Sequence, residues 1–421
     1  MSKWRIALIS VISVIGFALL ICVGIFVYAF IAFNTAEDSG LPRIDVITDD
    51  RFATIGKKDY VPCTVSLEGA DDEFNFSDLD AEIRGRGNST WNLYPKKPYR
   101  IKFSEKTSLF GEAKNKSWVL LAMYNDFSYI KDRLAFTLAD SIGSDAFVPS
   151  YNYVELYLNG TYKGIYLLTD QVDENKGRAG VKFDFTAEDK EVPFLVEIDE
   201  YAPDEGEEGI HYFTVSGRYF AIKYPEEDER YTDEQFTYIK EYIETVDALC
   251  RKKNVTLSEL SEYLDIESFM DFYIVQELMG QTEINFKSVY MSRAVGGKLK
   301  MGPIWDFDWS VNGPYLTEYK NVNIDRIEGL CSGDNFFGNL YKGSHEFRAA
   351  LSRRYLEIRD GLKAAIDTVD SEKDILRSAI KKDKIRWHLF HFDADFDARS
   401  DEVIDWVSRR LLWMDKAFVT D

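Results

Sequence analysis

Two carboxylates alternate with aromatic residues in the segment Trp305-Asp306-Phe307-Asp308-Trp309. In an extended chain, side chains two positions apart point to the same side, so we expect the two aspartates to share one site. Carboxylates held that close repel each other, and a hard cation such as Mg²⁺ bridging to a phosphate would neutralise them. The segment therefore predicts a metal and phosphate site. The alternative is the polar edge of an ordinary strand.

A second segment combines glycines, arginines and small polar side chains. It contains Arg84, Gly85, Arg86, Gly87, Asn88, Ser89 and Thr90 in direct succession. A turn of this composition can offer backbone N–H groups and guanidinium forks to phosphate oxygens. It therefore indicates an anion-binding turn. The alternative is a surface turn whose arginines pair with this chain's many acids.

Lysines mark the strand expected after that turn. The stretch 96–103 includes Lys97 and Lys102, and either side chain could reach a nucleotide phosphate as the strand lysine of ordinary kinases does. Both could equally be solvated charges on a sheet edge. The three segments together favour a phosphorylated ligand bound with a metal ion.

The residue pattern around these segments predicts an α+β domain of two lobes. The first part of the chain is expected to be rich in strands and the later part mainly helical. Short, partly alternating stretches bounded by turn residues predict strands at 59–67, 80–84, 98–103 and 118–122. Alternating arms around Asn159-Gly160 predict a tight hairpin over 154–168, because this pair accepts positive φ angles. These elements form a mixed or antiparallel sheet.

Helices are expected mainly in the second half. An apolar stripe predicts one early helix at 128–142, and capping-box spellings beginning at Thr232 and Thr256 predict two more. A second hairpin over 288–301 leads into the aspartate segment, and amphipathic helices fill 344–419. The acidic stretches 202–209 and 225–230 are expected to be surface loops.

The N-terminus predicts a membrane anchor. Residues 6–33 contain no charged side chain, and ~20 apolar residues are enough for a helix to cross a bilayer. Because Lys3 and Arg5 precede the run, residues 1–5 are expected in the cytoplasm and the rest of the chain outside. A cleavable signal peptide is the alternative, but it would have a shorter apolar core. Residues 34–43 then form a linker and 44–421 the folded domain.

Composition limits the classes of partner. The formal charge of -21, from 51 Lys and Arg against 72 Asp and Glu, argues against a general affinity for nucleic acid. The four cysteines follow no zinc-binding spacing and make a poor disulfide framework. A metal-bound or cationic partner fits this charge better.

Over residues 80–315 the chain resembles the CotH kinase family. The resemblance is carried by four blocks in order, namely 84–103 with its Arg-Gly-Arg-Gly-Asn-Ser-Thr-Trp turn, the hairpin 158–168, the strand 194–199 and the Gly-Lys-Leu-Lys-Met-Gly-Pro-Ile-Trp-Asp-Phe-Asp block 297–308. The family implies a kinase-like two-lobed fold that binds ATP with Mg²⁺ or Mn²⁺. It also implies phosphorylation of Ser or Thr in exported or surface proteins, including spore-coat proteins, by a bacterial cell-surface enzyme.

The family's roles carry over onto matching positions of this chain. The turn from Arg84 to Thr90 would face the phosphates, Lys97 or Lys102 would contact the nucleotide, and Asp306 with Asp308 would hold the metal. Glu283 matches the general base, where the family often has Asp, and Asp199 and Glu197 are the next carboxylates to consider.

Because this chain has Glu283 where the family often has Asp, a second function stays open. It is a catalytically weak nucleotide-binding scaffold for envelope or spore-coat assembly. A Glu places its carboxylate about one methylene farther out than Asp, which can lower a rate considerably. A third function, a surface carbohydrate-binding or adhesion protein, is favoured by 8 Trp and 25 Tyr that could stack on sugars. Metal-dependent ATP binding separates the third function from the first two.

Overall fold

The computed structural model describes residues 3–34, 39–143, 147–173, 189–225, 231–311, 327–333, 336–389, 391 and 395–419. The acidic stretch 225–230, predicted to be a loop, lies outside these residues except for Pro225, and part of the predicted linker also lies outside them. Within the described residues the α+β prediction is confirmed, with strands concentrated before residue 225 and helices after it.

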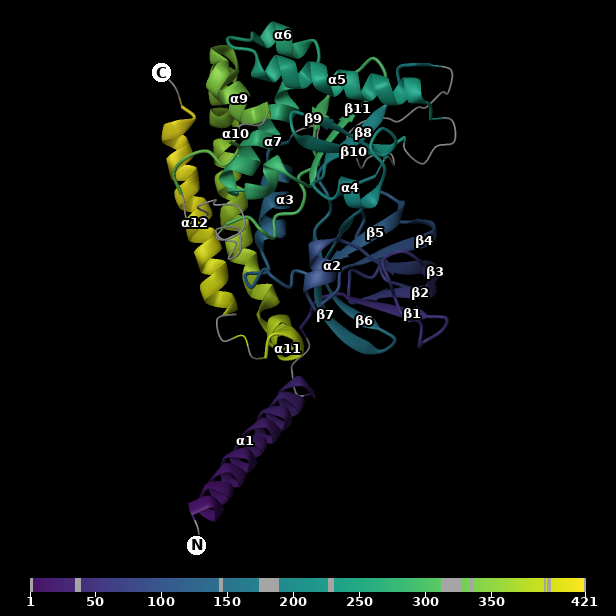
Figure 1. Cartoon of the computed structure of the whole chain (residues 1–421), viewed down its shortest axis with the longest axis vertical. Coiled ribbons are helices and arrows are strands. Elements are labelled where there is room, and N and C mark those ends of the chain that lie inside the picture. Colours follow the sequence, from purple (N-terminus) through teal and green to yellow (C-terminus); the bar gives the residue numbers. More distant parts are fainter. Residues whose placement is uncertain are drawn as a thin grey trace.

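Seven strands of the first half close into a barrel, which the sequence did not predict (Figure 1). Its order is β1-β2-β3-β4-β5-β7-β6, and every neighbouring pair is antiparallel except β1 and β6, which pair in parallel and close it. The strands are β1 (Arg43–Thr48), β2 (Val61–Glu68), β3 (Phe76–Gly85), β4 (Tyr99–Thr107), β5 (Asn115–Leu121), β6 (Asn152–Leu158) and β7 (Thr161–Asp170). Alternate side chains such as Ile101, Phe103 and Trp118 fill the interior with apolar core.

The predicted hairpin is confirmed at β6 and β7. Asn159 and Gly160 both have positive φ, at 51° and 75°, as a two-residue turn between twisted strands requires. Gly164, farther along β7, is needed for a different reason. A Cβ there would lie 2.1 Å from a carboxylate oxygen of Asp383 in helix α11, so the helix can pack closely on the barrel because this residue is glycine.

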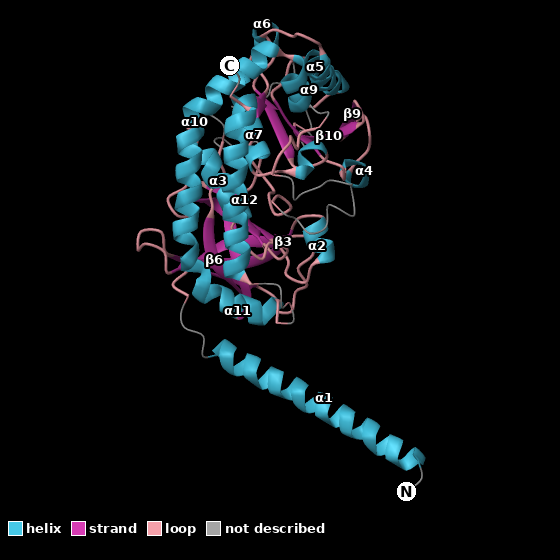
Figure 2. Ribbon diagram, turned by 90° about the vertical axis from the view of Figure 1, so that its left-hand side faces the viewer, coloured by secondary structure: helices cyan, strands magenta, loops and turns pink. Residues whose placement is uncertain are grey.

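The second lobe contains a smaller antiparallel sheet with helices around it (Figures 1 and 2). Its strand order is β12-β11-β8-β10-β9, and the predicted hairpin over 288–301 is confirmed as β11 and β12. These strands are β8 (Phe194–Ile198), β9 (Tyr212–Val215), β10 (Arg218–Tyr224), β11 (Val289–Arg293) and β12 (Lys300–Met301). The sheet and its helices share one continuous apolar core that is separate from the barrel core.

The helices of the chain lie mostly in or against this second lobe. They are α2 (Ser89–Leu93), α3 (Lys131–Ser141), α4 (Ala202–Glu205), α5 (Asp233–Arg251), α6 (Leu257–Ser261), α7 (Ile266–Leu278), η1 (Thr282–Asn285), α9 (Phe336–Gly343), α10 (His345–Glu372), η2 (Lys373–Leu376), α11 (Arg377–Trp387) and α12 (Phe396–Ala417). Both predicted capping boxes are present, at Thr232 before α5 and Thr256 before α6. The stretch 202–209, predicted to be a loop, begins instead with the single turn α4.

Helix α1 (Lys3–Asn34) extends away from the rest of the described chain (Figure 2). Its portion Val14–Asn34 is long and apolar enough to cross a membrane, with a mean hydropathy of 2.8 in its most apolar window. A signal sequence near an N-terminus has the same properties. The helix is therefore one N-terminal apolar segment of membrane-spanning length, as the sequence predicted.

A fully buried ion pair ties α11 to the barrel. Lys96 Nζ lies 2.9 Å from Asp383 Oδ1 and donates to the Ile165 carbonyl at 2.7 Å, and the Tyr129 hydroxyl donates to Asp383 Oδ2 at 2.6 Å. Burial lowers the pKa of Lys96, while Asp383 opposes this shift. The buried Lys96 ammonium therefore depends on this carboxylate to balance its charge in the interior.

We expect Asp383→Ala to destabilise the domain by about 3 to 5 kcal/mol, because it leaves the Lys96 ammonium buried without a counter-charge. Thermal and denaturant unfolding measure this loss. Asp360→Ala, which removes an exposed carboxylate, should leave the melting temperature unchanged. The double variant Lys96→Met with Asp383→Leu should recover part of the loss. Equal melting temperatures for the Asp383 and Asp360 variants would contradict the prediction.

Candidate active site

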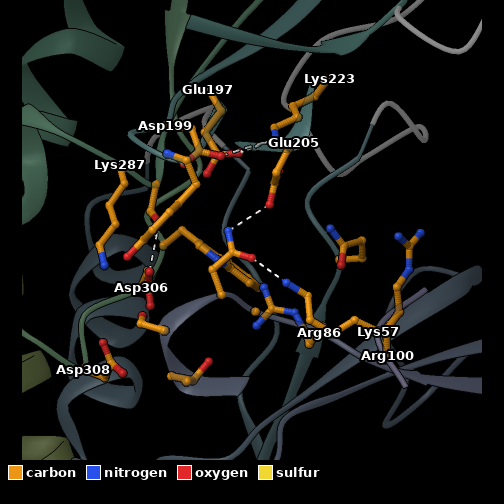
Figure 3. A pocket seen from close by; sticks show the side chains of 18 of the residues that line it. Lys57, Arg86, Arg100, Glu197, Asp199, Glu205, Lys223, Lys287, Asp306 and Asp308 are labelled. Carbon is orange, nitrogen blue, oxygen red and sulfur yellow. Dashed lines mark hydrogen bonds and ion pairs between the residues drawn. The ribbon is translucent and has the colours of Figure 1, made fainter. Parts of the chain in front are cut away.

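A cavity of about 420 Å³ lies where the barrel meets the second sheet (Figure 3). One wall comes from the loop between β1 and β2, the end of β3, the turn after it and β4, and carries Lys57, Arg84, Arg86 and Arg100. The other wall comes from β8, α4, β10, β11 and the loop after β12. Its ionisable side chains are Glu197, Asp199, Tyr201, Glu205, Lys223, Lys287, Tyr290, Asp306 and Asp308. A basic barrel wall thus faces a wall that is mainly acidic.

The structure brings the two predicted metal aspartates to this cavity by a different local conformation from the one expected. The segment 305–309 is not a strand, and Asp306 has a φ of 64°, in the left-handed region. The Ser288 hydroxyl donates to Asp306 Oδ2 at 2.9 Å, and the Gln281 side-chain amide donates to the Asp306 carbonyl at 2.7 Å. These two bonds hold the aspartate in that conformation and turn its carboxylate into the cavity.

Asp308 is buried among other carboxylates. Burial raises its pKa well above the ordinary value, and the negative charges of Asp306, Asp132 and Glu283 add to the shift. Among the described residues, its buried Oδ1 atom has no hydrogen-bond partner. Ionisation of Asp308 therefore carries a free-energy penalty in the described structure unless a cation binds beside it.

Asp132, at the start of α3, was not predicted from the sequence. Its Oδ1 accepts a hydrogen bond from the Phe307 backbone N–H at 2.7 Å, and burial together with Asp306 raises its pKa to about 7. The residue therefore fixes the backbone between Asp306 and Asp308. No local signal marked it, because in the sequence Asp132 stands between two other charged residues, Lys131 and Arg133.

The predicted anion-binding turn lines the cavity in full, from Arg84 to Thr90. Gly87 has a φ of 76°, which its lack of a side chain permits. Asn88 connects the two walls, because its amide oxygen accepts from Lys57 Nζ at 2.6 Å and its amide nitrogen donates to Glu205 at 2.9 Å (Figure 3). The turn is thus fastened to the second lobe across the cavity.

Arg86 is the guanidinium of this turn closest to the acids. Its centre lies 5.7 Å from the Trp305 ring, and burial lowers its pKa while Asp306 raises it. Within the described part of the chain its guanidinium makes no hydrogen bond to a protein acceptor, although an arginine stays charged at any physiological pH. Its donors are therefore available to an anionic ligand.

The structure places neither predicted nucleotide lysine at the cavity. Lys97 Nζ donates to the Trp91 carbonyl at 2.5 Å. Lys102 is exposed on the outside of the barrel near Tyr60, because its strand neighbours Ile101 and Phe103 point into the core. The lysines that do line the cavity are Lys57, Lys223 and Lys287, from segments that the sequence did not single out for this contact.

Glu283, the predicted general base, lies next to the cavity lining rather than in it. It sits in η1, is 5% exposed, and its Oε1 is 2.8 Å from Nζ of Lys287, which does line the cavity. Burial raises the pKa of Glu283 to about 7, and Lys287 opposes the shift. In the part of the chain that the structure describes, its buried Oε2 has no hydrogen-bond partner. A carboxyl group that titrates near neutrality has the pKa that a general base needs.

The alternative carboxylates Glu197 and Asp199 line the cavity directly, on β8 and just after it. Lys223 of β10 lies 3.1 Å from Glu197 and 3.7 Å from Asp199. Burial raises the pKa of both carboxyl groups, that of Glu197 to about 7, while Lys223 opposes the shifts. The one cation of this trio is therefore already shared between two carboxylates.

Asp306 and Asp308 supply part of the ligand set that a divalent cation needs. Among the described residues, no three His, Cys, Asp or Glu side chains form a group that could hold a metal alone. Mg²⁺, however, is commonly bound through one or two carboxylates together with phosphate oxygens and water. The Asp308 oxygen that has no partner among the described residues, together with Asp306, fits that kind of site, in which phosphate oxygens and water complete the ligand set.

Residues 83–414 match the model of a family described as CotH kinase protein. The match covers well over half of the chain and reaches beyond the segment that carries the resemblance in the sequence. Comparison with curated proteins gave no match.

A solved structure, the crystal structure of the Helicobacter pylori proinflammatory kinase CtkA, also matches. It is 10% identical, the match covers 88% of this chain and 98% of that one, and the TM-score is 0.29.

Proposed function

Because this chain belongs to the CotH kinase protein family, we propose that it is a metal-dependent protein kinase that transfers the γ-phosphate of ATP to Ser or Thr of exported or cell-surface proteins. The observation that carries the proposal is one cavity in which Asp306 and Asp308 meet the turn from Arg84 to Thr90. Segments more than 200 positions apart thus bring two carboxylates and a turn with arginine and backbone N–H donors to one cavity. That is the pairing which phosphoryl transfer requires.

In this reaction the residues of the site would have separate roles. Asp306 and Asp308 would hold Mg²⁺ or Mn²⁺, which neutralises charge on the phosphates when bound. Arg86 and the backbone of its turn bind phosphate oxygens. The acceptor hydroxyl oxygen forms a bond to the γ-phosphorus as the bond from that phosphorus to the β–γ bridging oxygen breaks. ADP leaves, and the hydroxyl proton passes to Glu283.

A catalytically weak nucleotide-binding scaffold is the second candidate. It is favoured by the position of Glu283, whose carboxylate is buried beside Lys287 and does not line the cavity. Catalytic hydrogen bonds are often incomplete before substrates bind, so this geometry does not decide between the two functions.

The test uses the ectodomain from about residue 40 with ATP and Mg²⁺ or Mn²⁺. A kinase should show metal-dependent thermal stabilisation by ATP and should incorporate radiolabelled phosphate into itself or an acceptor protein. Stabilisation without incorporation would favour the scaffold. The absence of both would leave a carbohydrate-binding or adhesion protein, to be tested on sugar arrays.

We further propose that α1 anchors the protein in a bacterial cell membrane, with residues 1–5 in the cytoplasm and the kinase domain outside. The charge-free run and the basic residues before it support this topology. Protease added to intact protoplasts should therefore remove the domain. If the domain survives while a cytoplasmic marker is also protected, the orientation is wrong. Release of the domain into the medium would indicate a cleaved signal sequence.

A further inference from the structure

We propose that Lys287 is the catalytic residue that contacts the γ-phosphate, with Glu283 holding its ammonium group in place. The inference rests on the proposed kinase function and assigns a residue to the phosphate contact that the sequence had given to Lys97 or Lys102. It is carried by the position, the burial and the incomplete pairing of this lysine.

Lys287 is positioned from three sides. It lies between η1 and β11, and its Nζ is 2.8 Å from Glu283 Oε1, 5.8 Å from the centre of the Tyr201 ring and 5.9 Å from that of Trp309. Its side chain is 11% exposed, and it lines the cavity. A long flexible side chain is thus confined to one place beside the predicted reaction centre, which lowers the entropy lost when it binds a ligand.

The Lys287 ammonium group has N–H donors left for a ligand. An ammonium carries three N–H donors, and within the described residues Glu283 is its one ion-pair or hydrogen-bond partner. The neighbouring charges are those of Asp306 and Asp308, which, with Glu283, raise the pKa of Lys287 above its ordinary value. Lys287 is therefore fully charged, and in Figure 3 it lies on the same side of the cavity as both metal aspartates.

The other cavity lysines are less suited to this contact. Lys223 is shared between Glu197 and Asp199, so a phosphate would approach two carboxylates for one cation. Lys57 donates to Asn88 on the barrel wall, away from the aspartates (Figure 3). Lys287 has a single carboxylate partner and adjoins the residues that would hold the metal. The γ-phosphate, which the metal must also reach, is the group such a cation would contact.

The proposal makes Lys287 responsible for the preference of the site for ATP over ADP. In Lys287→Gln, metal-dependent thermal stabilisation by ATP should fall to the level given by ADP, while stabilisation by ADP stays as in the parent. Phosphate transfer should fall about 10²- to 10³-fold, the usual loss for one donor aimed at developing charge.

A double variant separates loss of the phosphate contact from loss of the local fold. Lys287→Gln alone leaves Glu283 buried without a cation, which could unfold the segment or keep the carboxyl group protonated. Glu283→Gln combined with Lys287→Gln contains neither charge and should fold, yet it should still lack the ATP preference. Glu283→Gln alone should keep the preference, because an amide oxygen still accepts from the lysine. Lys300→Gln, which removes a lysine paired with Asp265 outside the cavity, is the matched control.

The outcomes separate this inference from the proposed function. If the double variant is stabilised more by ATP than by ADP, as the parent is, Lys287 does not contact the γ-phosphate, although the protein still binds nucleotide. A parent that binds ATP and ADP equally also overturns the inference. A parent stabilised by neither nucleotide overturns the proposed function itself.

Discussion

Asp308→Asn should abolish phosphate transfer and at the same time make the free domain slightly more stable. In the native structure the carboxyl group of Asp308 is buried near three other acids, and its pKa is raised well above the ordinary value. The ionised form is therefore less favourable in the folded than in the unfolded chain at neutral pH. Asparagine has nearly the same shape without the charge, so it removes this cost and also removes the metal ligand.

We expect the transfer rate of the variant to fall about 10³-fold or more, because losing a metal that supplies several kcal/mol of charge stabilisation has this effect. Radiolabel incorporation measures the rate. Melting curves with and without ATP and Mg²⁺ should show a higher baseline melting temperature and no metal-dependent increase.

Asp306→Asn should likewise lose metal-dependent stabilisation. Asparagine is the better replacement there than alanine, because Asp306 has a φ of 64° and Asn tolerates this region more readily. Asp405→Asn, which neutralises an exposed helix carboxylate, should behave as the parent in both assays. Unchanged ATP stabilisation in both active-site variants would return the segment 305–309 to a purely structural role.

Local sequence signals predicted those parts of the fold that local physics determines. The Asn159-Gly160 turn and the capping boxes at Thr232 and Thr256 depend on residues a few positions apart, and all three are present. Closure of the barrel does not depend on such local signals. It depends on the parallel pairing of Arg43–Val46 with Glu155–Leu158, more than 100 positions away, and no short pattern encodes that pairing.

The same distinction applies to the candidate site. The predicted anion-binding turn and the predicted metal-binding segment with Asp306 and Asp308 are each contiguous in sequence, and both line the cavity. Strand alternation places Lys102 outside the barrel, because its neighbours Ile101 and Phe103 point inward, so its residue type alone does not predict a contact with the cavity. Lys223 and Asp132 reach the site through the packing of separate elements, so their roles become visible with the tertiary structure.

Glu283→Gln should keep ATP binding and lose transfer, by about 10²- to 10⁴-fold, if Glu283 takes the proton of the acceptor hydroxyl. Nucleotide affinity depends on the turn, on Lys287 and on the metal aspartates, all of which the variant retains. Thermal stabilisation by ATP and Mg²⁺ should therefore equal that of the parent, while radiolabel incorporation falls.

The pH dependence of transfer distinguishes a base from a residue that only holds Lys287. A general base acts when it is ionised, and the pKa of Glu283 is raised to about 7 by burial, so the parent rate should climb as the pH rises through about 7. The residual rate of Glu283→Gln should lack this rise. Glu283→Asp adds a test of adaptation, because a faster Asp variant would mark a weakened site and a slower one a backbone fitted to Glu. A Gln variant that transfers at the parent rate with the same pH profile would exclude Glu283 as the base. The carboxylates Asp199 and Glu197, which line the cavity beside Lys223, would then be the groups to replace.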